Sequence, residues 1–312
     1  FIGSSVIGFW YWCTDQFIVQ RVLSGKDETQ ARRGAIFGAY LKLTPVFLFL
    51  IPGMVAFAMQ KHGITVNGET FTMSSADAAF PTLVAKLLPA GFKGLVVCGI
   101  LAALMSSLAS LFNSSAMLFT IDFYKKYRPK ASEKTLLYVG RVATVVVVVL
   151  GILWIPVMKS VGSVLYNYLQ DVQSVLAPGI AAAFLLGICS KKATPKGGMW
   201  GLIAGFIIGI TRLGAKVYYT SGATFSDSWF KYLFYDTNWV FFCGGMLLFC
   251  MLVIVVVSRF TTPAPAEQIV GLTFGSTTDE QKAVTRASWN KWDVIHSAII
   301  ILITVVFYWY FG

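Results

Sequence analysis

Residues 94–124 read GLVVCGILAALMSSLASLFNSSAMLFTIDFY, an apolar run of 31 residues that contains one charged side chain, Asp122. A helix needs about 20 mostly apolar residues to cross the hydrocarbon core of a bilayer, which is roughly 30 Å thick. Strands of a membrane barrel would instead alternate over segments of about ten residues. The run therefore predicts a helix embedded in a membrane.

The composition of the whole chain agrees with this reading. Of the 312 residues, 56% are hydrophobic and 12% are charged, whereas soluble domains carry about 25% charged residues. These values exclude a water-soluble monomer, and they exclude disorder, which is typical of apolar-poor and charge-rich chains. Eight stretches are long and apolar enough to span: 1–20, 34–59, 94–124, 135–157, 162–189, 198–218, 239–258 and 294–311. We therefore predict an all-α polytopic membrane protein with about eight transmembrane helices.

The net charge of +11 follows the expected topology of the connecting loops. Loops 21–33, 125–134, 190–197 and 259–292 carry 16 Lys and Arg residues, whereas the opposite loops 60–93, 158–161 and 212–238 carry 7. The positive-inside rule places the first set in the cytoplasm. These bases do not lie on one soluble domain, so we expect no nucleic-acid partner. The longest external loop, 60–93, contains a short amphipathic helix predicted over residues 76–88, and 259–292 is a cytoplasmic surface linker.

The first stretch carries a polar cluster where a spanning helix should be apolar. Residues 11–16 read YWCTDQ, and Gly3 and Gly8 precede them. Such a pattern favours a helix that unwinds and lines a substrate cavity, as broken helices do in transporters. Alternatively, Asp15 lies near the cytoplasmic end of the helix and pairs with Arg21.

Lys42 lies about 12 Å into the second stretch when counted from Gly34 at 1.5 Å per residue. Its long stem allows it to snorkel to the inner interface, and contact with a substrate is the other interpretation. Pro45 can kink the helix three residues later.

Small residues recur in the third stretch at four-residue spacing. Ala102, Ser106, Ser110 and Ser114 form this stripe, which can serve close helix packing in lipid. Alternatively, the adjacent hydroxyls of Ser106 and Ser107, with the Ala103 carbonyl one turn back, offer oxygen ligands to a hard cation such as Na⁺.

The fifth stretch is polar in its outer half. Asn167, Gln170, Asp171 and Ser174 share one helical face, followed by the break predicted at residues 178–179, Pro-Gly. This face favours a solute pathway with a hinge, and interhelical hydrogen bonding is the competing interpretation.

The sequence contains few features that indicate an enzyme. The sequence has no nucleophile elbow, metalloprotease motif or phosphate-binding loop. The five cysteines have no metal-ligand spacing and are typical of small buried hydrophobic residues. We therefore expect a protein that is not an enzyme.

Four stretches closely resemble the sodium/glucose cotransporters of the sodium/solute symporter family. They are residues 11–21 (YWCTDQFIVQR), 102–115 (AALMSSLASLFNSS), 119–124 (FTIDFY) and 178–187 (PGIAAAFLLG). The resemblance implies a multi-pass cell-membrane symporter for sodium and a sugar, with an inverted-repeat core of five plus five helices. In it, residues 1–189 would be the second repeat and residues 190–312 the peripheral helices. The first repeat is missing from the chain and is expected to complete the site.

The resemblance also implies roles for individual residues. The sodium ligands fall on the carbonyl of Ala103 and the hydroxyls of Ser106 and Ser107. The substrate site falls on four residues, in which the Tyr stacks on the sugar and the Lys and Gln hydrogen-bond it: Tyr11, Trp12, Lys42 and Gln170. Gly8 departs from the family, which has an amide or hydroxyl there. The alternatives are another solute (inositol, a sialic acid or an amino acid), a transport-silent sensor, or a passive channel.

Overall fold

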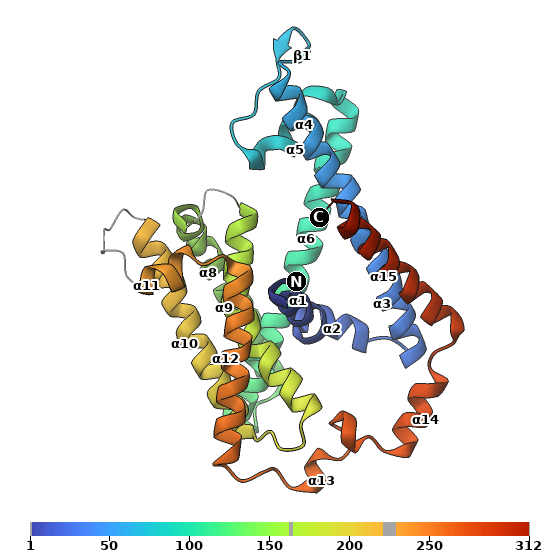
Figure 1. Cartoon of the computed structure of the whole chain (residues 1–312), viewed down its shortest axis with the longest axis vertical. Helices are drawn as coiled ribbons and strands as arrows, with labels where there is room; N and C mark the ends of the chain where they lie inside the picture. The colour runs from blue at the N-terminus through green and yellow to red at the C-terminus, as the bar shows by residue number, and fades with distance from the viewer. Residues whose placement is uncertain (1, 162–164, 221–228, 312) are drawn as a thin grey trace. The chain divides into compact units, whose positions relative to one another are not determined.

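A computed structural model describes residues 2–161, 165–220 and 229–311. The first residues of the predicted span 162–189 and the middle of the predicted loop 212–238 lie outside the described residues. Within these ranges the structure is almost wholly helical (Figure 1). Seven helices are long and apolar enough to cross a membrane: Glu28–Lys61, Ala90–Tyr127, Glu133–Pro156, Tyr166–Cys189, Pro195–Thr220, Trp239–Arg259 and Lys291–Tyr310. The prediction of an all-α polytopic membrane protein is confirmed.

The chain divides into two compact units, which we describe separately. The first unit comprises Phe1–Arg32 and Pro156–Lys291, and the second comprises Arg33–Ile155 and Trp292–Gly312. The two units are defined by which residues pack together. The predicted boundary at residue 189 instead separates an inverted repeat from peripheral helices, and it stays a prediction.

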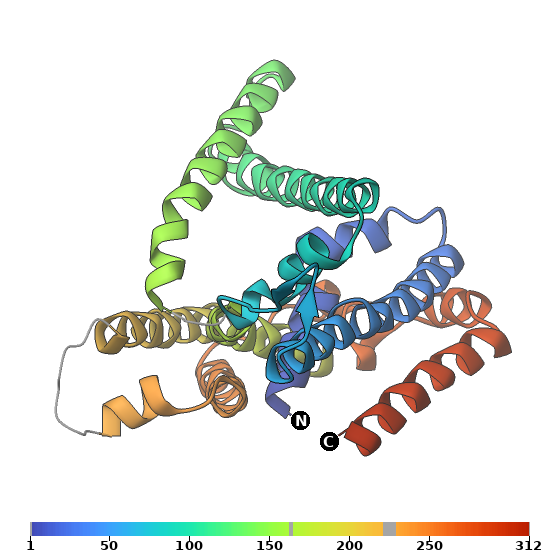
Figure 2. The ribbon, with the colours of Figure 1, turned by 90° about the horizontal axis from the view of Figure 1, so that it is seen from above.

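The first unit is built around three long helices, α9, α10 and α12, which pack against one another (Figure 1; Figure 2). Its core includes small and sulfur-bearing side chains beside larger aliphatic and aromatic ones; Ala177, Ala181, Cys243 and Cys250 are fully buried. Small core residues let membrane helices approach closely. The elements of this unit are α1 (Ile2–Phe9), η1 (Trp10–Thr14), α2 (Gln16–Leu23), α9 (Leu165–Cys189), α10 (Pro195–Thr220), α11 (Trp229–Lys231), η5 (Tyr232–Asp236), α12 (Trp239–Arg259), α13 (Ala266–Ile269), η6 (Phe274–Ser276) and α14 (Asp279–Ala287).

Four buried glycines at four-residue spacing line one face of α10: Gly197, Gly201, Gly205 and Gly209. A Cβ atom on Gly205 would lie 3.2 Å from the Cα of Gly179 on α9, and one on Gly209 would lie 2.8 Å from the backbone oxygen of Val175. The helix backbones therefore touch, which only residues without a side chain allow.

The predicted break at Pro178 does not occur, because α9 continues as one helix from Leu165 to Cys189. Pro178 is buried, and the backbone of its neighbour Gly179 lies against Gly205 of α10. Neighbouring helices can hold a proline-containing membrane helix together in this way.

The first predicted span is broken, as its glycines and polar cluster indicated. Helix α1 ends at Phe9, a π-helical turn (η1) covers Trp10–Thr14, Asp15 is extended at φ −73° and ψ 118°, and α2 begins at Gln16. Asp15 caps α2, because its carboxylate accepts a hydrogen bond of 3.1 Å from the backbone N–H of Phe17. The guanidinium of Arg21 lies 4.8 Å above the ring of Phe17.

The second unit holds the remaining long helices. Helix α3 ends at Pro45 and a π-helical segment follows, so the regular helix changes at the predicted position. The elements are α3 (Glu28–Pro45), η2 (Val46–Leu50), α4 (Ile51–Lys61), β1 (Thr65–Val66), β2 (Glu69–Thr70), η3 (Ala76–Ala78), α5 (Ala79–Leu87), α6 (Ala90–Leu118), η4 (Phe119–Tyr124), α7 (Lys125–Tyr127), α8 (Glu133–Val161) and α15 (Lys291–Phe311). Helix α3 begins in the first unit and α8 ends there.

The predicted external loop 60–93 folds on itself. Its predicted helix is confirmed as η3 and α5. The loop also contains a hairpin, β1–β2, which turns at Asn67-Gly68, both with positive φ. Asn-Gly is a preferred pair for this turn. Ala56, Phe71 and Leu83 form a small core beneath the hairpin.

Candidate functional site

Tyr11 and Trp12 lie next to each other in the π-helical turn of the broken helix. Their rings are 5.4 Å apart between centroids at an interplanar angle of 87°, an edge-to-face arrangement. Trp12 remains 43% exposed within the chain. The turn also contacts α9, the helix that carries Gln170. Two aromatic faces are thus presented at the point where the helix is interrupted.

Ala103, Ser106 and Ser107 lie within about one turn of α6, in the second unit. All three are exposed in the isolated chain. Within the part of the chain that the structure describes, the hydroxyls of Ser106 and Ser107 make no hydrogen bond. Their oxygens are therefore available to another ligand.

The other two serines of the stripe use their hydroxyls differently. Ser110 donates to the carbonyl of Ser106 at 3.0 Å, and Ser114 donates to the carbonyl of Ser110 at 2.8 Å. This is the usual way in which a helical serine satisfies itself. Ser106 and Ser107 thus differ from Ser110 and Ser114 in having hydroxyls that do not bond to the helix backbone.

Lys42 lies on α3, three residues before Pro45, and its side chain is exposed in the isolated second unit. Lys42 and the α6 residues belong to one unit, and Tyr11, Trp12 and Gln170 belong to the other.

Gln170 lies on α9 with its amide half satisfied. Its Nε2 donates to the hydroxyl of Tyr166 at 2.9 Å. Its Oε1 is buried, and it has no hydrogen-bond partner among the described residues. Burying an acceptor without a hydrogen-bond partner costs free energy. A donor from a bound ligand would therefore stabilise this oxygen.

Asp171, next to Gln170, forms a charge network that the sequence analysis did not predict. Its Oδ1 accepts from Arg212 at 3.0 Å and its Oδ2 accepts from Lys216 at 2.9 Å. Both cations lie on α10, which runs to Thr220, as the predicted span 198–218 requires and not as the overlapping predicted loop 212–238 would have it. For Asp171 the competing interpretation, interhelical hydrogen bonding, is therefore the one that the structure shows.

Arg212 is the largest fully buried side chain among the described residues, with 1% exposed. It donates from Nη2 to the backbone oxygen of Thr237 at 2.9 Å, and its guanidinium carbon lies 4.0 Å above the ring of Phe242. Its Nε and Nη1 have no hydrogen-bond partner in the described ranges. The ring thus supplies a π-face to a cation that one carboxylate and one carbonyl hold.

Ser174, on the same predicted polar face, forms its hydrogen bond within α9. It is fully buried, and its hydroxyl donates back to the carbonyl of Asp171 at 2.7 Å. The signal for this arrangement was present in the sequence, because Arg212 and Lys216 are spaced i, i+4 near the end of a predicted span. Intramembrane cations of this kind usually pair within the protein.

The described residues contain no group of three or more His, Cys, Asp or Glu side chains that could hold a metal ion. The oxygens on α6 are of another kind, a backbone carbonyl and two neutral hydroxyls. Such an oxygen donor set suits a hard cation.

Comparison with known proteins gives one family and several relatives. The sodium:solute symporter family model matches residues 2–205. Sodium/glucose cotransporter 1 of Ovis aries is 40% identical over 269 residues, which covers 84% of this chain and 40% of the relative. Sodium/glucose cotransporter 4 of Homo sapiens is 40% identical over 280 residues, which covers 87% of this chain and 41% of the relative.

A third relative covers nearly all of the chain. The sodium/mannose cotransporter SLC5A10 of Bos taurus is 36% identical over 328 aligned residues, which covers 99% of this chain and 55% of the relative. The chain thus spans about two fifths to just over half of the length of the relatives it matches.

Proposed function

This chain belongs to the sodium:solute symporter family, and on that premise we propose that it forms part of a cell-membrane transporter that couples sodium entry to uptake of a glucose- or galactose-like sugar. In this proposal residues 1–189 form the second inverted repeat and residues 190–312 the peripheral helices. A first inverted repeat would complete both binding sites. The protein is a transporter and not an enzyme.

The observation that carries the proposal is the pair of unengaged hydroxyls on α6. Ser106 and Ser107 make no hydrogen bond through their side chains among the described residues, whereas Ser110 and Ser114 do. Together with the carbonyl of Ala103 they supply three oxygens for Na⁺. A helical carbonyl that already accepts one N–H retains a second lone pair for an ion.

Four residues are proposed to contact the sugar: Tyr11, Trp12, Lys42 and Gln170. An aromatic ring covers the apolar C–H face of a pyranose while the phenol keeps a polar group at its edge. The buried Oε1 of Gln170, which lacks a partner among the described residues, would accept a sugar hydroxyl. Lys42 would donate to another.

Coupling requires that each ligand bind one conformation better than the other. Sodium on α6 would favour the outward-open state, and sugar at the broken helix would then allow closure. The interrupted backbone at Asp15 is suited to this, because the two half-helices can move separately.

The direct test is solute counterflow in proteoliposomes that contain the full-length protein. We expect labelled glucose or galactose to accumulate against its gradient only when sodium is present. Accumulation of inositol, sialic acid or an amino acid, and not of a sugar, would show that the transported solute is one of these compounds. Binding without accumulation would identify a sensor, and equilibration without concentration would identify a channel.

We predict that Ser107→Ala weakens sodium activation of uptake by about tenfold to 100-fold. A hydrogen bond or ligand to a charged partner contributes about 1.5–3 kcal/mol, and about 1.4 kcal/mol corresponds to tenfold. The measurement is the sodium concentration that gives half-maximal uptake at saturating sugar. Ser110→Ala is the matched control, since its hydroxyl is bonded to the carbonyl of Ser106; equal effects of both variants would contradict the site.

We predict that Gln170→Leu weakens sugar binding by about tenfold or more, while the sodium activation measured without sugar is unchanged. The substitution keeps the bulk of the side chain but removes the acceptor and the donor. Binding of labelled sugar to purified protein at saturating sodium measures the effect. Leu in place of the exposed Asn167, one turn earlier on α9, should leave sugar affinity within about twofold, and a loss as large as that of Gln170→Leu would argue against a specific contact.

A further inference from the structure

A cavity of about 660 Å³ lies in the first unit, where α9 and α12 end. Its lining combines two kinds of side chain. Three cations, Lys191, Lys192 and Arg259, stand beside apolar residues that include Leu186 and Val255. Leu186 lies on the same helix as Gln170 of the proposed transport site, but about four turns farther along α9.

The two kinds of side chain lie at different depths along the helices. Leu186 precedes the end of α9 at Cys189, and Lys191 follows that end. On α12, Val255 lies four residues, or about 6 Å, before Arg259, the last residue of the helix. The apolar lining is therefore on the membrane side of the cations, within the spans Tyr166–Cys189 and Trp239–Arg259.

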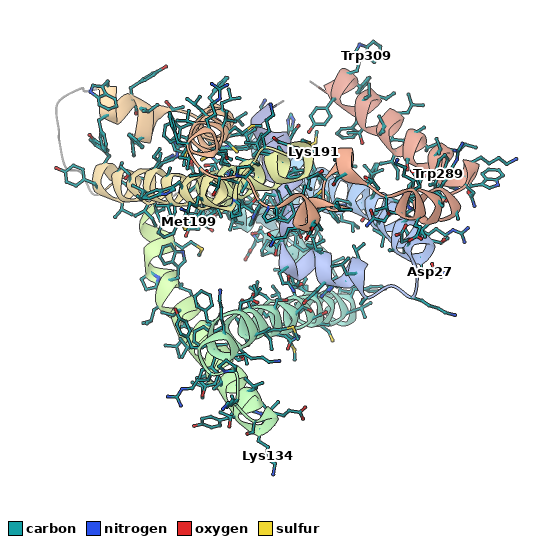
Figure 3. All side chains as sticks on the ribbon, turned by 90° about the horizontal axis from the view of Figure 1, so that it is seen from below. Asp27, Lys134, Lys191, Met199, Trp289 and Trp309 are labelled. Carbon is teal, nitrogen blue, oxygen red and sulfur yellow. The ribbon has the colours of Figure 1, made fainter. Side chains whose placement is uncertain are left out.

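The cations are available to an anion. None of the three forms an ion pair with a carboxylate in the part of the chain that the structure describes. Lys191, labelled in Figure 3, lies just beyond α9, and a Cβ atom on Gly275 would lie 2.8 Å from its Cε. The short helix η6 therefore packs directly on the stem of this lysine and restricts it.

A hydroxyl donor completes the polar end of the cavity. The Oγ of Ser258 accepts a hydrogen bond of 3.1 Å from the backbone N–H of Thr194. It also accepts a longer hydrogen bond of 3.4 Å from the hydroxyl of Thr194, and no described residue accepts its own proton. It can therefore donate to an oxygen of a bound group.

We propose that this cavity binds an anionic phospholipid. The phosphate would lie among Lys191, Lys192 and Arg259 and accept from Ser258, and an acyl chain would lie along Leu186 and Val255. Charge complementarity selects an anionic headgroup over a zwitterionic one, and both loops that supply the cations are those predicted to be cytoplasmic. Basic pockets between transmembrane helices on that side are suited to such headgroups.

The test uses the purified full-length protein, stripped of lipid in detergent, and native mass spectrometry. We expect dioleoylphosphatidylglycerol to remain bound as discrete adducts where dioleoylphosphatidylcholine does not. The triple variant Lys191→Gln, Lys192→Gln and Arg259→Gln should bind phosphatidylglycerol roughly 100-fold more weakly, at about fivefold for each cation near the membrane surface.

Two further variants keep the result interpretable if the triple variant folds poorly. Lys191→Arg, Lys192→Arg and Arg259→Lys preserves all charges and should retain binding. A charge-matched triple on another predicted cytoplasmic loop, Lys125→Gln, Lys126→Gln and Arg128→Gln, should bind as the wild type does. Equal losses in both glutamine triples would overturn the proposal, because attraction would then be diffuse.

A separate competition experiment distinguishes a lipid phosphate from a soluble phosphate compound. Glycerol 3-phosphate and inorganic phosphate carry the charge without acyl chains. We expect neither to displace phosphatidylglycerol at a hundredfold excess. Displacement by either would overturn a lipid site in favour of a soluble phosphate compound.

Discussion

Asp171→Asn is expected to destabilise the protein by about 3–5 kcal/mol, the cost of removing one partner of a buried ion pair. The variant keeps the shape of the side chain but leaves the guanidinium of Arg212, with 1% exposed, beside a neutral amide. Lys216, now without the carboxylate, lies on the same helix and repels it. For a chain of this size the loss corresponds to a fall of about 10 °C in the thermal midpoint, which fluorescence-detected size exclusion after heating would measure.

The control for this variant is the same substitution at a surface ion pair. Asp279 pairs with Lys282 at 3.1 Å, but their side chains are 99% and 63% exposed. Asp279→Asn should therefore change stability by less than about 0.5 kcal/mol.

A double variant tests the cause of the effect. Adding Arg212→Met to Asp171→Asn removes the uncompensated charge, and buried ion pairs can often be replaced by apolar residues at little cost. The double variant should therefore be more stable than Asp171→Asn alone. If the two effects simply add, the charge of Arg212 is not what destabilises the single variant.

The fold followed from properties that a single sequence displays. Apolar runs of about 20 residues specify membrane helices whatever their neighbours are, which is why seven predicted spans appear as helices. The break in the first span was also predictable, because the glycines and the polar cluster that mark it act locally. The continuity of α9 through Pro178 was not, since it depends on Gly205 of α10, which only tertiary packing brings to it.

The candidate site was predictable only in part, and for the same reason. The pattern on α6 named Ser106 and Ser107 but could not distinguish their hydroxyls from those of Ser110 and Ser114. The sequence located the polar face of α9, but its residues do not share one role. Asp171 and Ser174 serve packing, whereas the oxygen of Gln170 is left without a partner among the described residues.

The ion pairs of Asp171 affect the neighbouring Gln170 of the proposed transport site. Gln170 directly precedes Asp171 on α9, and two cations of α10 hold the carboxylate of Asp171. A charge network of this kind sets the rotation of α9 about its axis. The residue that would contact the sugar is therefore held by the residue beside it, and Asp171→Asn should weaken sugar binding as well as stability.

Gly209→Leu is expected to destabilise the first unit by about 3 kcal/mol, at the upper end of typical overpacking costs. The new Cβ would lie 2.8 Å from the backbone oxygen of Val175, and a backbone atom inside a long helix cannot move aside as a flexible side chain can. Helices α9 and α10 would have to separate, which would also lengthen the contacts between Asp171 and Arg212. We expect a lower thermal midpoint and loss of the monodisperse peak in size exclusion.

The matched control lies on the same helix. Gly214 has open space where its Cβ would stand, and Leu has a higher helix propensity than Gly by several tenths of a kcal/mol. Gly214→Leu should therefore leave the thermal midpoint unchanged or raise it slightly. If both variants lower it equally, close packing of the α10 backbone on α9 is not what stabilises this unit, and general intolerance of α10 to leucine would explain the loss.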